Sequence, residues 1–436
     1  MRTHHAVLEM ITAALATLVA GLSLMLPNGF RWASQTSVLQ LDMLAASQPR
    51  AIAVGAIVAL IVAVFATTVN HALVAWGTAL CGVVTMFLAH LLAETGDQSI
   101  APATLNYLEA LAGGILLGGI AVAVLRGWFQ VFGWTLGALA AVVFGQLGST
   151  STGTVRRGAM TAPGWSTRTL PPMWLIVVTL VLVIVGMVVN RKQDTVERRS
   201  VELPMAPIIA GLIFVIGRLF SAEWLSRHAD SAGGVAFAAT LTVAAAVLAA
   251  VLLPRRDGVL ILLAVALSAV GGALIPARLP MWSVAPLVAL IALGLVAGFR
   301  RPMPMLAMST LAAMALYCAL VSGHRIHGGV QAAVLSGLLA AVAGYSFGSA
   351  APRYNPTRVL GVSIIFVPSV VTALRDHLDR PQCVSDPGQW YLCPAPAMSS
   401  AAPYWTALGI TVVCAAGLAA LRSWRKPTTT ESVADI

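Results

Sequence analysis

Three titratable side chains fall within or beside long apolar runs of this 436-residue sequence, where they could carry proton or anion chemistry. Arg218 lies in IFVIGRLFSAEWL, Glu109 lies in LNYLEALAGG, and His90 precedes Glu94 by four residues. A charge at bilayer depth is costly, so such residues usually pair with one another or line a polar path. We therefore treat Glu109, Arg218 and His90 as candidates for proton coupling or for binding an anionic substrate.

The nearest acidic residue along the chain is not a good partner for Arg218. Glu223 follows five residues later, whereas side chains three or four residues apart share a helix face. Together with Trp224 and Arg227, Glu223 is typical of an anchor at the membrane interface. Glu109 lies at a similar predicted depth on another span, so we predict a Glu109–Arg218 ion pair. The alternatives are an arginine that snorkels to the outer surface and a glutamate favoured by a helix N-terminus.

Polar and small residues accompany these charges. Gln130, near the start of the following span, is a further candidate for the polar path, and Pro368 predicts a kink in its own span. The glycines of GGILLGG (113–119) favour close helix packing. Two further stripes of small residues recur every four positions. They are Gly133, Gly137, Ala141 and Gly145, and Ala332, Ser336, Ala340, Gly344 and Gly348.

Motifs typical of enzymes are weak here. GYSFG (344–348) matches G-x-S-x-G, but it ends an apolar run instead of linking a strand to a helix. The sequence has no phosphate-binding loop and no HExxH pair. We expect neither an enzymatic activity nor a cofactor or metal.

Cys383 and Cys393 share one polar loop of the sequence, PQCVSDPGQWYLC. This loop is assigned to the outer face of a membrane, where oxidising conditions permit disulfides. We therefore predict a disulfide between the two residues.

The composition indicates the environment in which these residues lie. Hydrophobic residues make up 58% of the chain and charged residues 10%, whereas soluble domains carry about 25% charged residues. The sequence therefore predicts an all-α polytopic integral membrane protein. The net charge of +10 comes mainly from arginines between apolar runs. We interpret them as topology signals and contacts to anionic lipids, with no nucleic-acid partner.

Fourteen apolar runs have the length of a transmembrane helix. The weakest division is PARLPMW, between the ninth and tenth runs, and merging neighbouring runs would give twelve or thirteen. The predicted spans are 7–27, 51–69, 72–93, 106–125, 128–148, 172–190, 205–225, 234–253, 258–276, 281–299, 305–322, 329–349, 359–376 and 404–422.

Basic residues predict the orientation. The turns NRKQDTVERR, PRRDG and FRRPMP alternate as the positive-inside rule requires if both termini are cytoplasmic. We predict one transmembrane domain over 1–423 and a cytoplasmic disordered tail over 424–436, in a bacterial plasma membrane. Residues 1–228 and 229–423 could form an inverted seven-plus-seven repeat, as in many transporters.

The predicted layout is similar in span number to the larger drug-exporting branch of the major facilitator superfamily and to some flippases of the multidrug/oligosaccharidyl-lipid class. The similarity is confined to the number of spans. The facilitator signature Gly-x-x-x-Asp/Arg-x-Gly-Arg-Lys/Arg after the second span is replaced by TTVNHA. No residue role is carried over.

These observations favour a secondary transporter or flippase for an amphipathic or lipid-linked molecule, working by alternating access and coupled to protons through Glu109. The alternative is a non-catalytic membrane subunit that scaffolds a cell-envelope assembly. A transporter should contain a polar-lined cavity that Glu109 or Arg218 reaches, whereas a scaffold should lack one.

Overall fold

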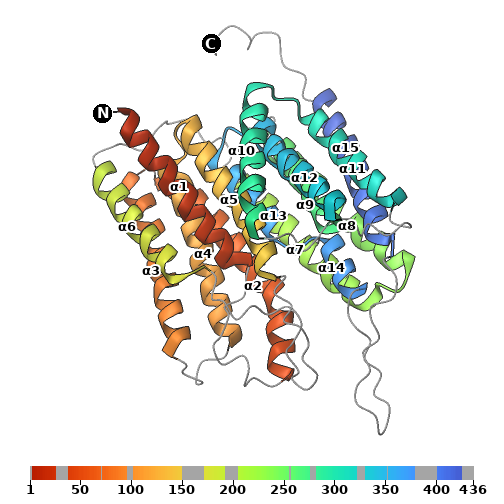
Figure 1. Ribbon diagram of the computed structural model, residues 1–436, viewed down its shortest axis with the longest axis horizontal. Helices are drawn as coiled ribbons and strands as arrows, with labels where there is room; N and C mark the ends of the chain where they lie inside the picture. Colours follow the sequence, from red (N-terminus) through yellow and green to blue (C-terminus); the bar gives the residue numbers. More distant parts are fainter. Residues whose placement is uncertain are drawn as a thin grey trace.

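A computed structural model describes most of the chain, and every regular element in the described part is helical (Figure 1). The predicted Cys383–Cys393 disulfide and the predicted tail lie outside the described residues, apart from Trp424. The described ranges are 2–25, 38–69, 71–95, 102–149, 171–191, 205–254, 257–274, 281–321, 329–350, 352–378 and 400–424.

The helices run side by side (Figure 1), and some consecutive helices, such as α4 and α5 or α7 and α8, are joined by short turns. The earlier part of the chain contains α1 (Arg2–Met25), α2 (Val38–Val69), α3 (Ala72–Thr95), α4 (Pro102–Val124), α5 (Trp128–Ser149), α6 (Met173–Asn190), α7 (Ala206–His228) and α8 (Ala232–Leu252). The later part contains α9 (Gly258–Leu274), η2 (Met281–Ser283), α10 (Val284–Arg300), α11 (Pro304–Val321), α12 (Gly329–Ala350), α13 (Asn355–Phe366), α14 (Val370–Leu378) and α15 (Ala402–Trp424).

The structure supports the prediction of a multi-pass membrane protein. Among the described residues, twelve helical segments are long and apolar enough to cross a membrane, with α13 and α14 counted together. Two shorter apolar helices, α9 and α10, occupy the places of the ninth and tenth predicted spans. Large apolar side chains such as Phe65, Leu293 and Leu320 are exposed. In water such a surface would promote aggregation, whereas in a bilayer it contacts lipid.

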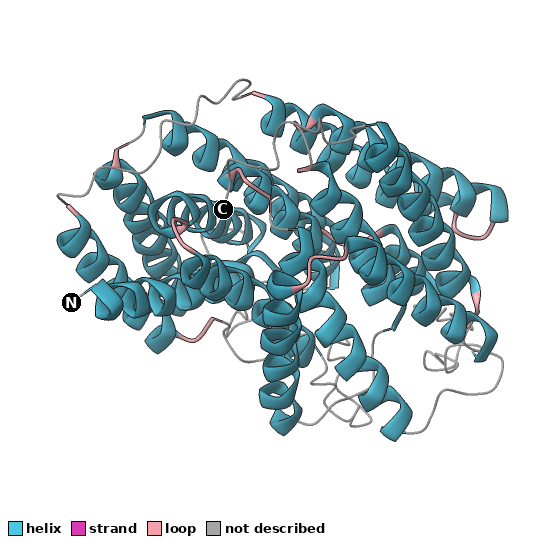
Figure 2. Cartoon of the chain, turned by 90° about the horizontal axis from the view of Figure 1, so that it is seen from above, coloured by secondary structure: helices cyan, strands magenta, loops and turns pink. Residues whose placement is uncertain are grey.

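Figure 1 shows the red-to-yellow helices on one side of the bundle and the green-to-blue helices on the other. Helix α1 begins and α15 ends at the same end of the bundle, which we call the terminal end; the other is the opposite end. Seen along the helices, the bundle is elongated (Figure 2). Helix α9 is apolar on all sides and buried for nearly its whole length, as expected for a helix surrounded by others.

The helix contacts repeat with an offset of eight helices along the chain when α13 and α14 are counted as one helix. Helix α1 packs against α5 as α9 packs against α13, and α2 packs against α4 as α10 packs against α12. The same offset relates α3–α6 to α11–α15, and it relates the contacts that join the two groups, α2–α13 and α5–α10. Helices α1–α6 and α9–α15 thus form two matching groups. Helices α7 and α8 lie between these groups in sequence.

This packing does not follow the predicted seven-plus-seven division. In that division the α1–α5 contact would correspond to a contact between α8 and α12, and no comparable one is formed. The small-residue stripes show the same difference. The stripe of α12 packs against α10, and its counterpart is formed by Gly114 and Gly118 of α4, which pack against α2. The α5 stripe, which had suggested the repeat, packs against α1 instead.

Close backbone contact explains why α4 and α12 carry glycine. A Cβ atom on Gly114 would collide with the carbonyl oxygen of Gly55 in α2. A Cβ atom on Gly344 would likewise collide with the carbonyl oxygen of Ile291 in α10. Neither oxygen belongs to a flexible side chain, so the helices themselves would have to separate.

We predict that Gly344→Ala destabilises the folded protein by about 1–3 kcal/mol, the usual cost of overpacking. The matched control is Gly409→Ala, because an added Cβ there meets no atom within 4 Å. Thermal unfolding in a neutral detergent measures both. Equal unfolding temperatures for the two variants would contradict the α10–α12 packing.

Candidate functional site

A large cavity lies between the two helix groups. Its volume is about 1030 Å³. Helices α1, α2 and α5 of the first group and α9, α10, α12, α13 and α14 of the second contribute to its wall, together with α7. The lining residues come from the part of each helix nearer the opposite end, where α1 ends and α2 begins. The cavity therefore belongs to that end of the bundle.

A break between α13 and α14 forms part of the cavity wall. The residue before a proline is driven to an extended conformation, and Val367 accordingly has φ −69° and ψ 127°. Pro368 has no N–H, so it cannot donate to the carbonyl of Ile364 four residues earlier. The chain resumes as α14 after Ser369, whose hydroxyl accepts a hydrogen bond from the Thr372 N–H at 3.0 Å.

Arg218 supplies the donors that this break removes. Its Nη1 donates to the Ile364 carbonyl at 3.0 Å, and its Nε donates to the Pro368 carbonyl at 3.0 Å. Its Nη2 donates to the Ser268 hydroxyl of α9 at 2.8 Å. A helix C-terminus favours a cation, so the end of α13 is a suitable position for this guanidinium. Arg218 therefore joins α7, α9 and the α13–α14 break.

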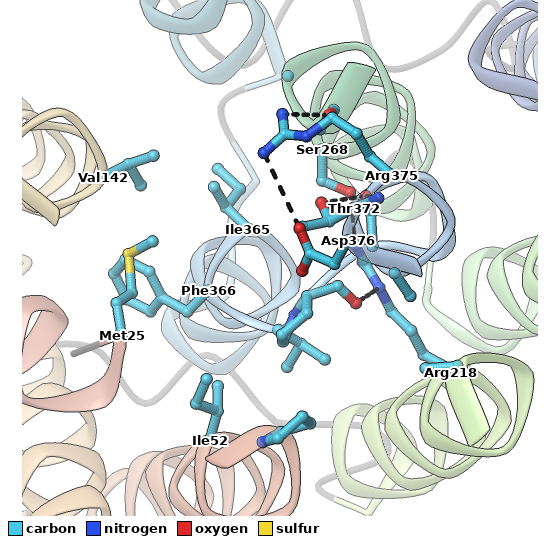
Figure 3. Close-up of a pocket in the computed structure, with 18 of the residues that line it drawn as sticks. Met25, Ile52, Val142, Arg218, Ser268, Ile365, Phe366, Thr372, Arg375 and Asp376 are labelled. Carbon is cyan, nitrogen blue, oxygen red and sulfur yellow. Dashed lines mark hydrogen bonds and ion pairs between the residues drawn. The ribbon is translucent and has the colours of Figure 1, made fainter. Parts of the chain in front are cut away.

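The predicted ion pair between Glu109 and Arg218 is not formed. Within the described part of the chain, Arg218 hydrogen-bonds to two carbonyls and a hydroxyl, and to no carboxylate. The reason is lateral position: α4, which carries Glu109, packs mainly against α1, α2 and α3, with a smaller contact to α13. Helix α7 packs against α2, α8, α13 and α14, and not closely against α4. The snorkelling alternative is also wrong, because Arg218 is 1% exposed and points into the bundle (Figure 3).

Other polar groups continue this wall towards the opposite end. Arg375 donates to the Gly272 carbonyl near the end of α9 at 3.1 Å and lies 3.9 Å from the Asp376 carboxylate. At the mouth, the Glu223 carboxylate lies 3.3 Å from both Arg50 and Arg227. The predicted Glu223–Arg227 cluster is thus present, with Arg50 added from α2.

The facing wall of the cavity is apolar. Figure 3 shows Met25, Val142 and Phe366 across the cavity from Arg218 and Arg375. Helices α5, α10 and α12 provide most of this wall. Its apolar side chains are Leu139, Val142, Val143, Leu287, Ile291, Leu339, Ala340 and Ala343.

Glu109 and His90 form a buried pair outside the cavity. Their side chains are 0% and 2% exposed, and His90 Nδ1 lies 3.5 Å from Glu109 Oε1. His90 Nε2 lies 3.0 Å from the Pro171 carbonyl, which can only accept, so Nε2 carries a hydrogen. Nδ1 then faces the carboxyl group either as an acceptor of its proton or as a donor to its anion. A proton on either Nδ1 or the carboxyl group would lie between the two residues.

Gln130 takes part in a cluster at the terminal end. Its Nε2 donates to Glu9 Oε2 at 2.9 Å. Burial lowers the pKa of the nearby Arg126 guanidinium, and the charge of Glu9 opposes this effect. Gln130 therefore lies far from Arg218 along the helix axis and is not part of the cavity wall.

A matching cluster occupies the same end of the second group. Asp257, just before α9, accepts a hydrogen bond from the Arg353 N–H at 3.2 Å. Burial raises the pKa of the Asp257 carboxyl, while hydrogen bonds from Arg353, Thr357 and Tyr354 and the charge of Arg358 oppose the rise. Asn355 Nδ2 lies 3.5 Å from the Leu125 carbonyl of the first group. This contact joins the two groups at the terminal end.

The sequence signalled some of the residues of the cavity and missed others. Arg218 was a candidate and lines the cavity, and Ser336 and Ala340, placed in a packing stripe, line it too. Ser268 and Thr372 were missed, because a serine or threonine in an apolar helix usually bonds its own backbone. The link from Arg218 to Ile364 had a readable signal, since Pro368 must leave that carbonyl without its helical donor.

Comparison with known proteins gives no assignment: no protein-family model matches the chain, and no curated protein matches it. The function must therefore be argued from the geometry of the cavity.

We predict that Arg218→Met destabilises the protein by about 3 kcal/mol or more, because each buried carbonyl left without a donor costs about 1–3 kcal/mol. Adding Pro368→Ala should recover about 1 kcal/mol or more, because it returns an N–H that can reach Ile364. Pro368→Ala alone should recover nothing, since Arg218 already serves that carbonyl. Unfolding free energies of the four proteins in a double-mutant cycle measure this coupling. Purely additive effects would contradict the proposed link.

Proposed function

We propose that this protein is a secondary transporter or flippase that moves an amphipathic small molecule across the membrane by alternating access. The observation that carries the proposal is the cavity between the two helix groups, with a polar wall around Arg218 and an apolar wall opposite. Substrate sites of secondary transporters lie between repeated halves and are often formed by interrupted helices. The α13–α14 break and its position in the cavity wall fit this pattern.

Alternating access would consist of rocking of α1–α6 against α9–α15. Matched helices are eight apart along the chain when α13 and α14 are counted as one span. Because consecutive spans alternate in direction, helices an even number of spans apart run in the same direction. The two groups would then be a parallel repeat, related by an axis along the membrane normal. In the structure the groups meet at the terminal end through Asn355 and Leu125 and enclose the cavity nearer the other end. With fourteen spans and cytoplasmic termini, this is an outward-facing arrangement.

Proton coupling would take place at the Glu109–His90 pair. The pair is buried, with His90 Nδ1 3.5 Å from Glu109 Oε1, and Ser23 of α1 donates to the Glu109 carbonyl at 2.9 Å. Three helices of the first group therefore meet at this point. A proton gained or lost here would change a buried charge between α3 and α4 and alter their packing.

The scaffold alternative fits the cavity less well. A scaffold has no need of a large internal space, because filling such a space with side chains would stabilise the bundle. The wall contains Arg218 with no carboxylate partner in the described part of the chain. Such a charge is costly in a purely structural helix.

Site-specific labelling can test alternating access without knowledge of the substrate. Ala222→Cys, on the cavity wall, is introduced in a background whose native cysteines are replaced by alanine. A membrane-impermeant maleimide is applied to intact cells. Linking Leu125→Cys to Asn355→Cys should hold the terminal end closed and increase the labelling rate of Ala222→Cys severalfold. An unchanged rate would sink the transporter proposal and favour the scaffold.

The matched control is a cross-link within one helix group. Glu9 and Gln130 touch one another but both belong to α1–α6, so linking Glu9→Cys to Gln130→Cys should leave the labelling rate unchanged. An equal increase from this link would show that any cross-link has the effect, and it would remove the support for rocking.

We further predict that the labelling rate of Ala222→Cys depends on external pH, and that Glu109→Gln reduces this dependence while the protein still reaches the membrane. Glutamine keeps the shape of the side chain but cannot hold the proton. Gln130→Glu at the terminal end serves as a control for altered acidity elsewhere. A full pH dependence in Glu109→Gln would exclude this pair as the coupling site.

A further inference from the structure

We infer that the cavity binds an anionic amphiphile, with an acidic head group such as a phosphate against the α7–α9–α14 wall and an alkyl tail against the α5–α10–α12 wall. This inference rests on the proposed function only in taking the cavity as the substrate site. It adds the sign of the charge, the chemistry of the head group and the orientation of the ligand.

The charge of the cavity wall determines the sign. Four arginines and two carboxylates line the cavity, which leaves an excess of two positive charges. Glu223 is shared between Arg50 and Arg227 at the mouth. Asp376 lies beside Arg375, whereas Arg218, deepest in the wall, bonds only neutral acceptors in the described structure. Walls of low dielectric focus such a field on the cavity. An anion is thus attracted and a cation repelled.

Hydrogen-bond donors identify the place of the head group. A guanidinium has five N–H donors, and three of those of Arg218 are used in its described bonds. The first turn of α14 adds the positive end of a helix dipole, because Ser369 and Thr372 line the same wall. A nine-residue helix that starts inside the bundle with an arginine beside its first turn provides both charge and donors. A phosphate or carboxylate group matches that combination.

Opposite this wall, the side chains suit an alkyl chain. Val142, Ile291 and Leu339 come from three helices, and none of them carries a polar group. Apolar contact of this kind contributes about 0.8 kcal/mol for each buried CH₂ group. The volume of about 1030 Å³ is at the upper end of the range for small-molecule sites, about 300–1,000 Å³. It therefore has room for a head group together with a tail.

Substitution of Ala222 tests whether the ligand is an anion while leaving Arg218 unchanged. Ala222 lies four residues after Arg218 on α7, hence on the same helix face, and it lines the cavity without being fully buried. Ala222→Glu places a carboxylate on the wall. Ala222→Gln has nearly the same shape without the charge, and Arg300→Gln changes the net charge at the exposed end of α10.

Binding is measured by native mass spectrometry on the full-length protein in a neutral maltoside detergent. The probes are dodecyl phosphate, butyl phosphate, inorganic phosphate and dodecyltrimethylammonium. We expect dodecyl phosphate to bind the wild type at least tenfold more tightly than either short-chain phosphate or the cation. Ala222→Glu should weaken it by about tenfold, the effect of roughly one charge-assisted contact. Ala222→Gln and Arg300→Gln should each change it by less than about twofold.

Each contrary result overturns a stated part of the inference. Equal binding of dodecyltrimethylammonium would exclude an anionic head-group site. Binding of inorganic phosphate as tight as that of dodecyl phosphate would identify a free anion as the ligand and exclude the tail wall. Equal effects of Ala222→Glu and Ala222→Gln would place the bound probe outside the cavity. The cross-linking experiment tests rocking independently of ligand binding. If the anion binds but cross-linking does not alter the labelling rate of Ala222→Cys, the transport proposal is rejected and the binding site is retained.

Discussion

The contact between Arg218 and the α13–α14 break is the interaction on which the cavity depends. Pro368 removes the donor of one buried carbonyl, and a helix interrupted inside a bundle exposes the backbone groups on both sides of the break. Arg218 satisfies the carbonyls of Ile364 and Pro368 and adds a bond to Ser268. The same side chain leaves a positive charge at the cavity wall. One residue thus stabilises an irregular backbone and also gives the space beside it a polarity that an apolar bundle would lack.

Helices α7 and α8 explain how such a residue reaches the break. They lie between the two matching helix groups in sequence, and α7 packs against α2 of the first group and against α13 and α14 of the second. A bundle of two six-span groups alone would offer no helix at this position. The inserted helix therefore closes one side of the cavity and delivers Arg218 to the interrupted helix. This arrangement also explains why the polar wall is contributed mainly by α7, α9 and α14, while the lining from α5, α10 and α12 on the other side is apolar except for Ser336.

The sequence predicts the environment and the helices better than it predicts their neighbours. Apolar run length places the spans, so each predicted span overlaps an α-helix. The exceptions in detail are 359–376, which is divided into α13 and α14, and 51–69, where α2 already begins at Val38. The position of a residue within an apolar run also predicts its depth in the membrane, and this predicted similar depths for Glu109 and Arg218. Depth says nothing about which helices are adjacent, and α2 lies between α4 and α7. The helix packing does not follow the predicted repeat for a related reason: Ala and Gly are so common here that the α5 and α12 stripes resemble each other, although their packing partners differ. Pro368 was the more informative residue, because a missing N–H requires a donor from elsewhere.

The same position of α2 gives a physical connection between the Glu109–His90 pair and the cavity. Helix α2 packs along α4, which carries Glu109, and also along α7, which carries Arg218, and its residues from Gln48 to Ile52 contribute to the cavity wall. No side chain separates α4 from α2 at Gly114, because the backbone there lies directly against the Gly55 carbonyl. Tightly packed helices transmit small displacements instead of absorbing them. A change of charge at Glu109 and His90 that shifts α4 must therefore also shift α2, and with it the cavity wall. Direct contact between the Glu109–His90 pair and Arg218 would then be unnecessary for the proposed coupling, and their separation keeps the carboxylate from neutralising the arginine of the cavity wall.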